Sequence, residues 1–364
     1  MQFIDLKSQY QAYRTEIDAG IARVLEHGRY IMGPEIAEME TQLADLVDQP
    51  HAISCASGTD ALLLALMALG VGPGDEVVTV GFTFIATAEV ISLLGATPVF
   101  VEICEDDYGM DPEALAAAMT ERTKAIIPVS LYGQVCRMEA INQIAAEHDV
   151  VVIEDGAQSL GARQGDRMSC GLSTFSATSF FPSKPLGCYG DGGALFTNDD
   201  DLARICRELR AHGQERRYVH TRIGVNARMD AIQAAVILGK LPHFEAEMQK
   251  RSELGERYTE ALKGIVTTPQ ILPGNRHVYA QYSIQVDDRD GFRAHLQEAG
   301  VPTAVHYPVP LHLQEAFQYL GLGRGHLPRS ERISERIVSL PMSPFLTLTD
   351  QDRVIEAVRE FHGA

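Results

Sequence analysis

The feature that most constrains the fold of this chain is an alternation of short apolar runs with helical patterns through its first 200 residues. The predicted strands are residues 76–80, 97–101, 125–129, 150–154, 174–181 and 194–197. Helical patterns lie between them, at residues 59–69, 87–94, 111–119, 137–148 and 200–211. Strands that alternate with helices indicate βαβ units, which build a mainly parallel sheet with helices on both faces. We therefore expect an α/β protein.

The pattern changes after about residue 240. A polar-faced helix is predicted at residues 242–263, followed by a strand at 279–286, a helix at 289–299, a proline-rich loop at 307–310 and a last helix at 349–361. A length of 364 residues allows for two domains. We expect a large α/β domain at residues 1–240 and a smaller α+β domain at residues 241–364.

Composition excludes several classes of function. Lys and Arg number 31 against 49 Asp and Glu, a formal net charge of −18, so a nucleic-acid partner is not expected. The N-terminus lacks a signal-peptide pattern, and the most apolar stretch, residues 61–71, is too short to cross a bilayer. Six cysteines are scattered without a C-x-x-C pair, which predicts neither disulfides nor a metal site. We expect a cytoplasmic protein.

Ligands of an open parallel sheet bind beyond the carboxyl ends of its strands, and polar segments occur at these places. Residues 54–60 form a small-residue turn before an apolar helix, whose free N–H groups can hold a phosphate. Ordinary capping by Ser57 or Thr59 is the alternative for this segment. The strand at 150–154 leads into Asp155, which can hold a proton on a ring nitrogen of a cofactor or merely cap the next helix.

A further segment carries Ser179, Lys184 and a glycine-rich run at 190–193 that allows a tight turn with positive φ. A desolvated lysine has a lowered pKa and can form a Schiff base, whereas an exposed loop lysine is the alternative. Lys184 and Asp155 are one strand–connection–strand unit apart, so they can reach one site. Together with a phosphate-binding helix end, they are the groups that a pyridoxal phosphate (PLP) enzyme needs.

Segments 57–62, 154–159, 179–184, 190–193, 222–230 and 306–312 resemble the signatures of the fold-type-I, PLP-dependent nucleotide-sugar aminotransferases. The similarity runs in order from residue 3 to the C-terminal helix. It implies a large domain with a central, mainly parallel seven-stranded sheet and a smaller C-terminal α+β domain. Related sugar dehydratases have His at the position of Lys184, so the lysine indicates amine transfer rather than deoxygenation.

The resemblance also implies catalytic and cofactor-binding residues. Lys184 would form the Schiff base with PLP, and Asp155 would pair with the pyridine nitrogen. Further cofactor contacts are implied for Gly58, Thr59, Phe84, Gln158, Ser179 and Asn226. Gly58, Thr59 and Ser179 would hold the phosphate. Gln158 would contact the phenolic oxygen of the ring. Phe84 would stack on the ring, although a position in the core is its alternative. Asn226 would reach the cofactor of a neighbouring subunit, which implies a homodimer with shared active sites.

Within the family, the sequence is most similar to members that aminate C3 of a UDP-linked 2-acetamido-3-oxo-uronic acid in bacterial O-antigen synthesis. The resemblance implies L-glutamate as the amino donor and pyridoxamine phosphate as the intermediate form of the cofactor. Arg228 is the candidate for the sugar carboxylate, because a guanidinium binds carboxylates bidentately. A local pair with Asp230 is its alternative. His306 and Tyr307 are the candidates for contacts to the hexose.

Other functions make different demands on the sequence. An NAD(P)-dependent oxidoreductase needs G-x-G-x-x-G after the first strand, but the glycines at 70–74 precede a strand and include Pro73. A non-catalytic PLP-fold regulator or nucleotide-sugar-binding protein predicts loss of Lys184 or Asp155, or an added DNA-binding segment, and none of these is seen. Amination of a 4-keto nucleotide hexose stays open.

Overall fold

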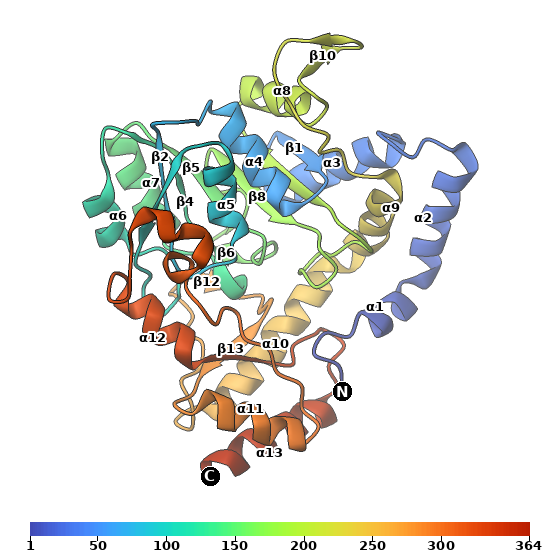
Figure 1. The fold of residues 1–364 in the computed structure, drawn as a ribbon. Coiled ribbons are helices and arrows are strands. Elements are labelled where there is room, and N and C mark those ends of the chain that lie inside the picture. Colours follow the sequence, from blue (N-terminus) through green and yellow to red (C-terminus); the bar gives the residue numbers. More distant parts are fainter.

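The computed structural model describes residues 1–364, and a seven-stranded sheet lies at its centre (Figure 1). The strand order is β1–β9–β8–β5–β4–β2–β3. The strands are β1 (His51–Cys55), β2 (Glu76–Val80), β3 (Thr97–Val101), β4 (Thr123–Ile127), β5 (Val151–Asp155), β8 (Phe175–Ser179) and β9 (Gly193–Thr197). Only β9 is reversed, pairing antiparallel with both β1 and β8. The predicted α/β class and mainly parallel sheet are confirmed.

Helices cover both faces of this sheet. One face packs a core of 22 buried residues against α4 (Gly58–Ala68), α5 (Ala86–Leu93) and α8 (Asp200–Leu209). The other face packs a core of 42 buried residues against α3 (Pro34–Val47), α6 (Pro112–Ala118), α7 (Met138–Glu147) and α9 (Ala231–Lys240). At the N-terminus, α1 (Leu6–Ala12) leads into α2 (Arg14–His27), which packs on α9. No helix combines the length and apolarity that a bilayer span requires.

A separate core of 18 buried residues lies in the C-terminal part of the chain. Its elements are α10 (Phe244–Leu262), β13 (Tyr282–Gln285), α11 (Arg289–Glu298), β14 (Ile337–Leu340) and α13 (Leu348–His362), with α12 (Pro328–Arg336) leading into β14. Helix α10 begins in the large core with Phe244 and Met248 and ends in this second core with Leu254 and Leu262. Because one helix serves both cores, the predicted boundary between residues 240 and 241 stays a prediction.

Smaller elements complete the fold. A three-stranded sheet of β12 (Asn275–Arg276), β6 (Arg163–Gln164) and β7 (Arg167–Met168) joins the two parts of the chain. The hairpin of β10 (Gln214–Arg216) and β11 (Val219–His220) projects beyond the body of the molecule (Figure 1). Short segments of 3-10 helix are η1 (Leu131–Gly133), η2 (Leu241–His243), η3 (Leu311–Leu313) and η4 (Glu315–Leu320).

The six strands predicted for the large sheet all form, with ends within two residues of the prediction. Strand β1 was not predicted, because its polar end was interpreted as the start of the turn before α4. Its only partner in the sheet is β9, which lies far along the chain. In the C-terminal part, β13 is shorter than the predicted strand, and Pro242 falls in η2, so that α10 begins at Phe244.

Candidate active site

A cavity of about 420 Å³ opens at the carboxyl ends of the parallel strands. Its size lies within the range of cofactor and small-ligand sites. The predicted site residues that line it are Gly58, Thr59, Phe84, Asp155, Gln158, Ser179, Lys184, His306 and Tyr307. The cavity thus collects side chains from α4, β5, the end of β8 and the C-terminal part of the chain.

The N-terminus of α4 forms one wall of the cavity. Ser57 is the N-cap residue, and its Oγ accepts a hydrogen bond from the backbone N–H of Asp60 at 3.0 Å. A Cβ built on Gly58 would lie 2.7 Å from the Cβ of Ser179, so only glycine allows β8 to pass this close. Capping by Ser57 and a set of free N–H groups facing the cavity therefore occur together.

The glycine-rich run at 190–193 serves close packing rather than a turn with positive φ. None of Gly190, Gly192 and Gly193 has a positive φ, so that prediction is wrong. A Cβ on Gly193 would lie 2.5 Å from the carbonyl carbon and oxygen of Ser57, and 2.7 Å from the backbone nitrogen of Gly58. The start of β9 therefore lies directly against the N-terminal turn of α4.

Asp155 ends β5, and its carboxylate is fixed by two donors. The hydroxyl of Thr87, at the start of α5, donates to Oδ2 at 2.8 Å, and the backbone N–H of Ala157 donates to Oδ1 at 3.2 Å. Burial raises the pKa of Asp155, while these bonds and the charge of Lys184 oppose the rise. Thr87 was not predicted from the sequence, because a threonine at the start of a helix carries no signal for contact with a distant strand.

The preceding residue, Glu154, points to the other face of the sheet, as alternation along a strand requires. Its carboxylate accepts hydrogen bonds from two serine hydroxyls and one backbone N–H. Burial raises its pKa, and these bonds oppose the rise. The two adjacent carboxylates thus belong to different surroundings, and only Asp155 reaches the cavity.

Lys184 lies in the loop that leaves β8 and returns as β9. The loop is held by its own backbone, since the N–H of Lys184 donates to the carbonyl of Phe181 at 2.8 Å and that of Cys188 to the carbonyl of Phe180 at 2.7 Å. Burial lowers the pKa of the Lys184 amine, and the charge of Asp155 opposes this. An exposed loop lysine, the alternative from the sequence, is excluded.

Gln158 connects the two parts of the chain across the cavity. Its Oε1 accepts from the backbone N–H of Tyr132 at 2.8 Å, and its Nε2 donates to the hydroxyl of Tyr307 at 3.1 Å. Tyr307 also lies against Phe84, with ring centroids 5.9 Å apart. Phe84 is 52% exposed at the cavity, which excludes the alternative of a core phenylalanine.

His306 enters the cavity as a neutral imidazole. Its Nδ1 lies 2.9 Å from the hydroxyl of Ser339. Burial, together with the charge of Lys184, lowers the pKa of His306 to about 4, so the ring carries no charge near pH 7. Apart from this histidine, Lys184 is the only basic side chain that lines the cavity.

Asn226 and Arg228 do not line this cavity. They lie between β11 and α9, where Nε and Nη2 of Arg228 donate to Oδ1 of Asn226 at 3.0 and 2.7 Å. Arg228 makes no ion pair with Asp230, so the local pair considered as its alternative is wrong. The two predicted site residues that the cavity lacks are instead bound to each other.

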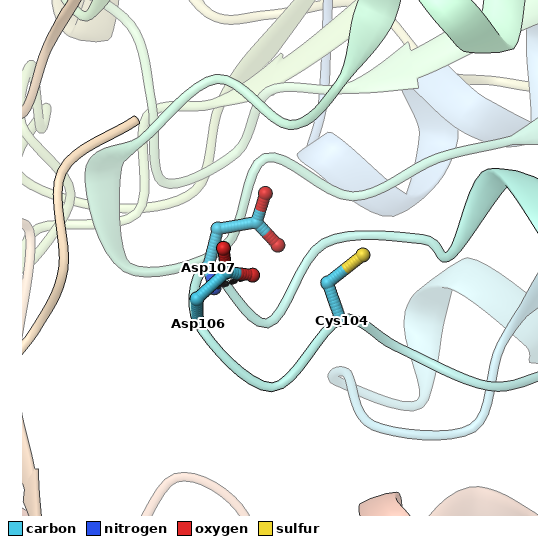
Figure 2. Close-up of side chains that lie close together, drawn as sticks. All are labelled: Cys104, Asp106 and Asp107. Carbon is cyan, nitrogen blue, oxygen red and sulfur yellow. Dashed lines mark hydrogen bonds between the residues drawn. The ribbon is translucent and has the colours of Figure 1, made fainter. Parts of the chain in front are cut away.

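A second group of polar side chains, Cys104, Asp106 and Asp107, gathers in the loop after β3 (Figure 2). The guanidinium of Arg137 pairs with both carboxylates, at 2.7 Å from Asp106 Oδ2 and 3.2 Å from Asp107 Oδ2. Burial raises the pKa of the Cys104 thiol to about 11. The group is therefore an ion-paired cluster, in which the guanidinium of Arg137 supplies the positive charge that a metal ion would otherwise bring.

The fold and the cavity together define a class of enzyme. A carboxylate at a strand end, a lysine of lowered pKa and a free helix N-terminus, gathered in one cavity of a mainly parallel sheet, suit a phosphorylated, ring-bearing cofactor. Residues 11–359 match the model of the DegT/DnrJ/EryC1/StrS aminotransferase family. The chain belongs to this family and is an aminotransferase.

Similar proteins and solved structures extend over nearly the whole chain. UDP-2-acetamido-2-deoxy-3-oxo-D-glucuronate aminotransferase of Pseudomonas aeruginosa is 54% identical over 347 residues, covering 95% of this chain and 96% of that protein. DesV of Streptomyces venezuelae, solved with a ketimine intermediate, has a TM-score of 0.98 at 42% identity, covering 100% of this chain and 98% of the other. NtdA of Bacillus subtilis, solved with bound pyridoxamine phosphate, has a TM-score of 0.90 at 31% identity, covering 97% and 82%.

Proposed function

We propose that the chain is a PLP-dependent enzyme that aminates UDP-2-acetamido-2-deoxy-3-oxo-D-glucuronate at C3, with L-glutamate as the amino donor and 2-oxoglutarate as the second product. The observation that carries the proposal is the meeting of Lys184 and Asp155 in one cavity beside the N-terminus of α4. The 54% identity to the Pseudomonas aeruginosa enzyme supports the choice of sugar. A cytoplasmic location remains part of the proposal.

The cavity walls fit the proposed cofactor. The backbone of Gly58 and Thr59 would hold the phosphate with the hydroxyl of Ser179, because a helix N-terminus presents free N–H groups and a positive dipole end. Asp155 would hold the proton of the pyridine nitrogen, and Phe84 offers a ring face. When bound, PLP supplies an electron sink for the carbanion at the reacting carbon.

The side chains that line the cavity have separate roles in binding and in proton transfer. With its pKa lowered by burial, the Nζ of Lys184 can be neutral, and a neutral amine can both attack a carbonyl and accept the proton that leaves the reacting carbon. The Thr87 hydroxyl donates to the carboxylate of Asp155 and opposes the rise of its pKa that burial causes, which favours the ionised form. Gln158 and Tyr307 are joined to each other, so they present one fixed hydrogen-bonding edge to the ring and the hexose.

A homodimer is the proposed active unit. No arginine lines the chain's own cavity, and His306 is neutral, so a sugar carboxylate lacks a guanidinium partner there. The bonded pair of exposed Asn226 and half-buried Arg228 would meet this need in a second copy, with Asn226 at the cofactor phosphate and Arg228 at the sugar carboxylate. Because the two side chains are bonded to each other, we propose that they serve the same neighbouring site.

The test is the absorption spectrum of the purified protein with PLP, before and after addition of L-glutamate and then of the 3-keto uronate sugar. We expect a visible cofactor band that L-glutamate removes and the sugar restores, while the Lys184→Ala variant shows neither change. Restoration by 4-keto but not 3-keto sugars would reject the proposed position of amination. A spectrum that never develops a cofactor band would reject the PLP chemistry.

A further inference from the structure

The side chain of Gln281 is a cavity-lining group that the proposed chemistry does not use. It is 6% exposed, and its Oε1 is buried without a hydrogen-bond partner. Neither atom of its side-chain amide forms a hydrogen bond within the chain. Gln158, in the same cavity, has both ends of its amide bonded within the chain. Gln281 is therefore the glutamine of this cavity whose hydrogen-bonding capacity is left for a ligand.

The backbone fixes Gln281 in this position. Its N–H donates to the carbonyl of Tyr132, and the segment before it lies against Gly133, whose φ is +108°. A Cβ on Gly133 would lie 2.8 Å from the backbone nitrogens of Tyr279 and Ala280. Residues 279–281 are thus held against η1 by close backbone contact, so the side chain of Gln281 does not need a ligand to be directed into the cavity.

The chemistry of the amide oxygen selects among the ligands. A buried polar atom without a partner is rare and unfavourable, and a bound group that donates an O–H or N–H removes the penalty. The amino donor, once its amino group is at the reacting centre, offers only carboxylates, which accept hydrogen bonds and repel an amide oxygen. A nucleotide sugar offers ring hydroxyls and an acetamido N–H.

We propose that Oε1 of Gln281 accepts a hydrogen bond from a hydroxyl or acetamido N–H of the nucleotide sugar, which makes Gln281 a specificity-determining residue for the sugar half of the reaction. The inference rests on the proposed function and adds a contact that acts on one of the two substrates. In a ping-pong reaction each substrate has its own kcat/KM, so an effect on one half-reaction is separable from an effect on the other.

The experiment compares Gln281→Leu with Gln285→Leu. Gln285 is a matched control, because it is also a glutamine with 6% exposure in this stretch of chain, but its Nε2 donates to the hydroxyl of Tyr108 away from the cavity. We expect Gln281→Leu to lower kcat/KM for the 3-keto sugar about 10-fold, the equivalent of one neutral hydrogen bond. Its kcat/KM for L-glutamate and its cofactor spectrum should stay those of the wild type, and Gln285→Leu should leave both half-reactions unchanged.

Gln281→Glu tests the direction of the bond, because it keeps an acceptor oxygen at the same reach. We expect it to retain more activity toward the sugar than Gln281→Leu, and the reverse order would overturn the acceptor role. An equal loss in both half-reactions, or no loss with the sugar, would overturn the inference while the proposed function stands. Wild-type protein that responds to L-glutamate but never aminates the sugar would instead overturn the proposed function and this inference with it.

Discussion

The hydrogen bond from Thr87 to Asp155 gives a prediction whose magnitude depends on pH. Both residues are buried, and the hydroxyl lies 2.8 Å from Oδ2 of the carboxylate. Thr87→Val keeps the shape of the side chain but removes the donor, at a cost of about 2 kcal/mol for a hydrogen bond to a charged group. Because the removed bond stabilises only the charged form, the pKa of Asp155 should rise in the variant.

This cost falls only on the ionised carboxylate, so the variant loses unfolding free energy at high pH and not at low pH. Burial already raises the pKa of Asp155 in the folded chain, and the Val variant raises it further. The variant should therefore lose about 2 kcal/mol of unfolding free energy at pH values above the folded-state pKa of Asp155 in both proteins. The loss should shrink as the pH falls through the two folded-state pKa values and vanish below them, where both carboxyls are protonated.

Urea denaturation of cofactor-free wild type and Thr87→Val, across the whole pH range in which both proteins stay folded, measures this difference. Thr87→Ser retains the hydroxyl and is the control that should show little of the pH-dependent loss. In the loaded enzyme, the acid limb of the kcat profile should move to higher pH in the Val variant alone. A loss of the same size at every pH would refute the reasoning, because it would assign the contribution of Thr87 to packing rather than to the charge of Asp155.

Three further predictions concern the same site. Lys184→Ala should abolish turnover while PLP stays bound through its phosphate, as measured by cofactor retention on gel filtration; turnover near the wild-type rate would end the proposal. Gly193→Ala forces a Cβ against the backbone of Ser57 and should cost at least 1–3 kcal/mol and weaken PLP binding, whereas Gly72→Ala, with no atom within 4 Å, should do neither. Arg228→Ala should raise KM for the uronate sugar but not for its C6-hydroxymethyl analogue, and equal KM changes for the two sugars would exclude a contact to the carboxylate.

Much of the fold follows from local patterns in the sequence. The six strands first predicted are short runs rich in apolar residues, and residues 150–153 are continuously apolar, as burial on both faces of a parallel sheet favours. Strand β1 lacks this signal at its polar end and is defined by pairing with β9. Helix α12 was also missed, because its residues are mostly charged and few of them are buried.

The candidate site likewise contains residues that local sequence patterns predict and residues that they do not. Asp155 ends β5 and Lys184 lies in the loop that follows β8, so the topology of the sheet brings them to one edge. The bond from Thr87 and the free amide of Gln281 depend on contacts between segments far apart in the sequence, which no local pattern records. The glycine-rich run was recognised as special, but its reason is the approach of another backbone and not its own φ.

The reversed direction of β9 has a consequence for how the enzyme tolerates movement. Ser179 and Gly193 face each other in the register of β8 and β9, so the loop that bears Lys184 starts and ends at one pair of residues within the sheet. The Nζ of Lys240 also donates to the carbonyl of Gly187 at 2.6 Å, which fixes the far side of the loop to α9. The loop that bears the reactive amine is therefore anchored at both ends in the sheet and at its far side on α9. The C-terminal part of the chain supplies the opposite wall, with Gln281, His306 and Tyr307, so substitutions in that wall can alter sugar selectivity without disturbing the anchored lysine.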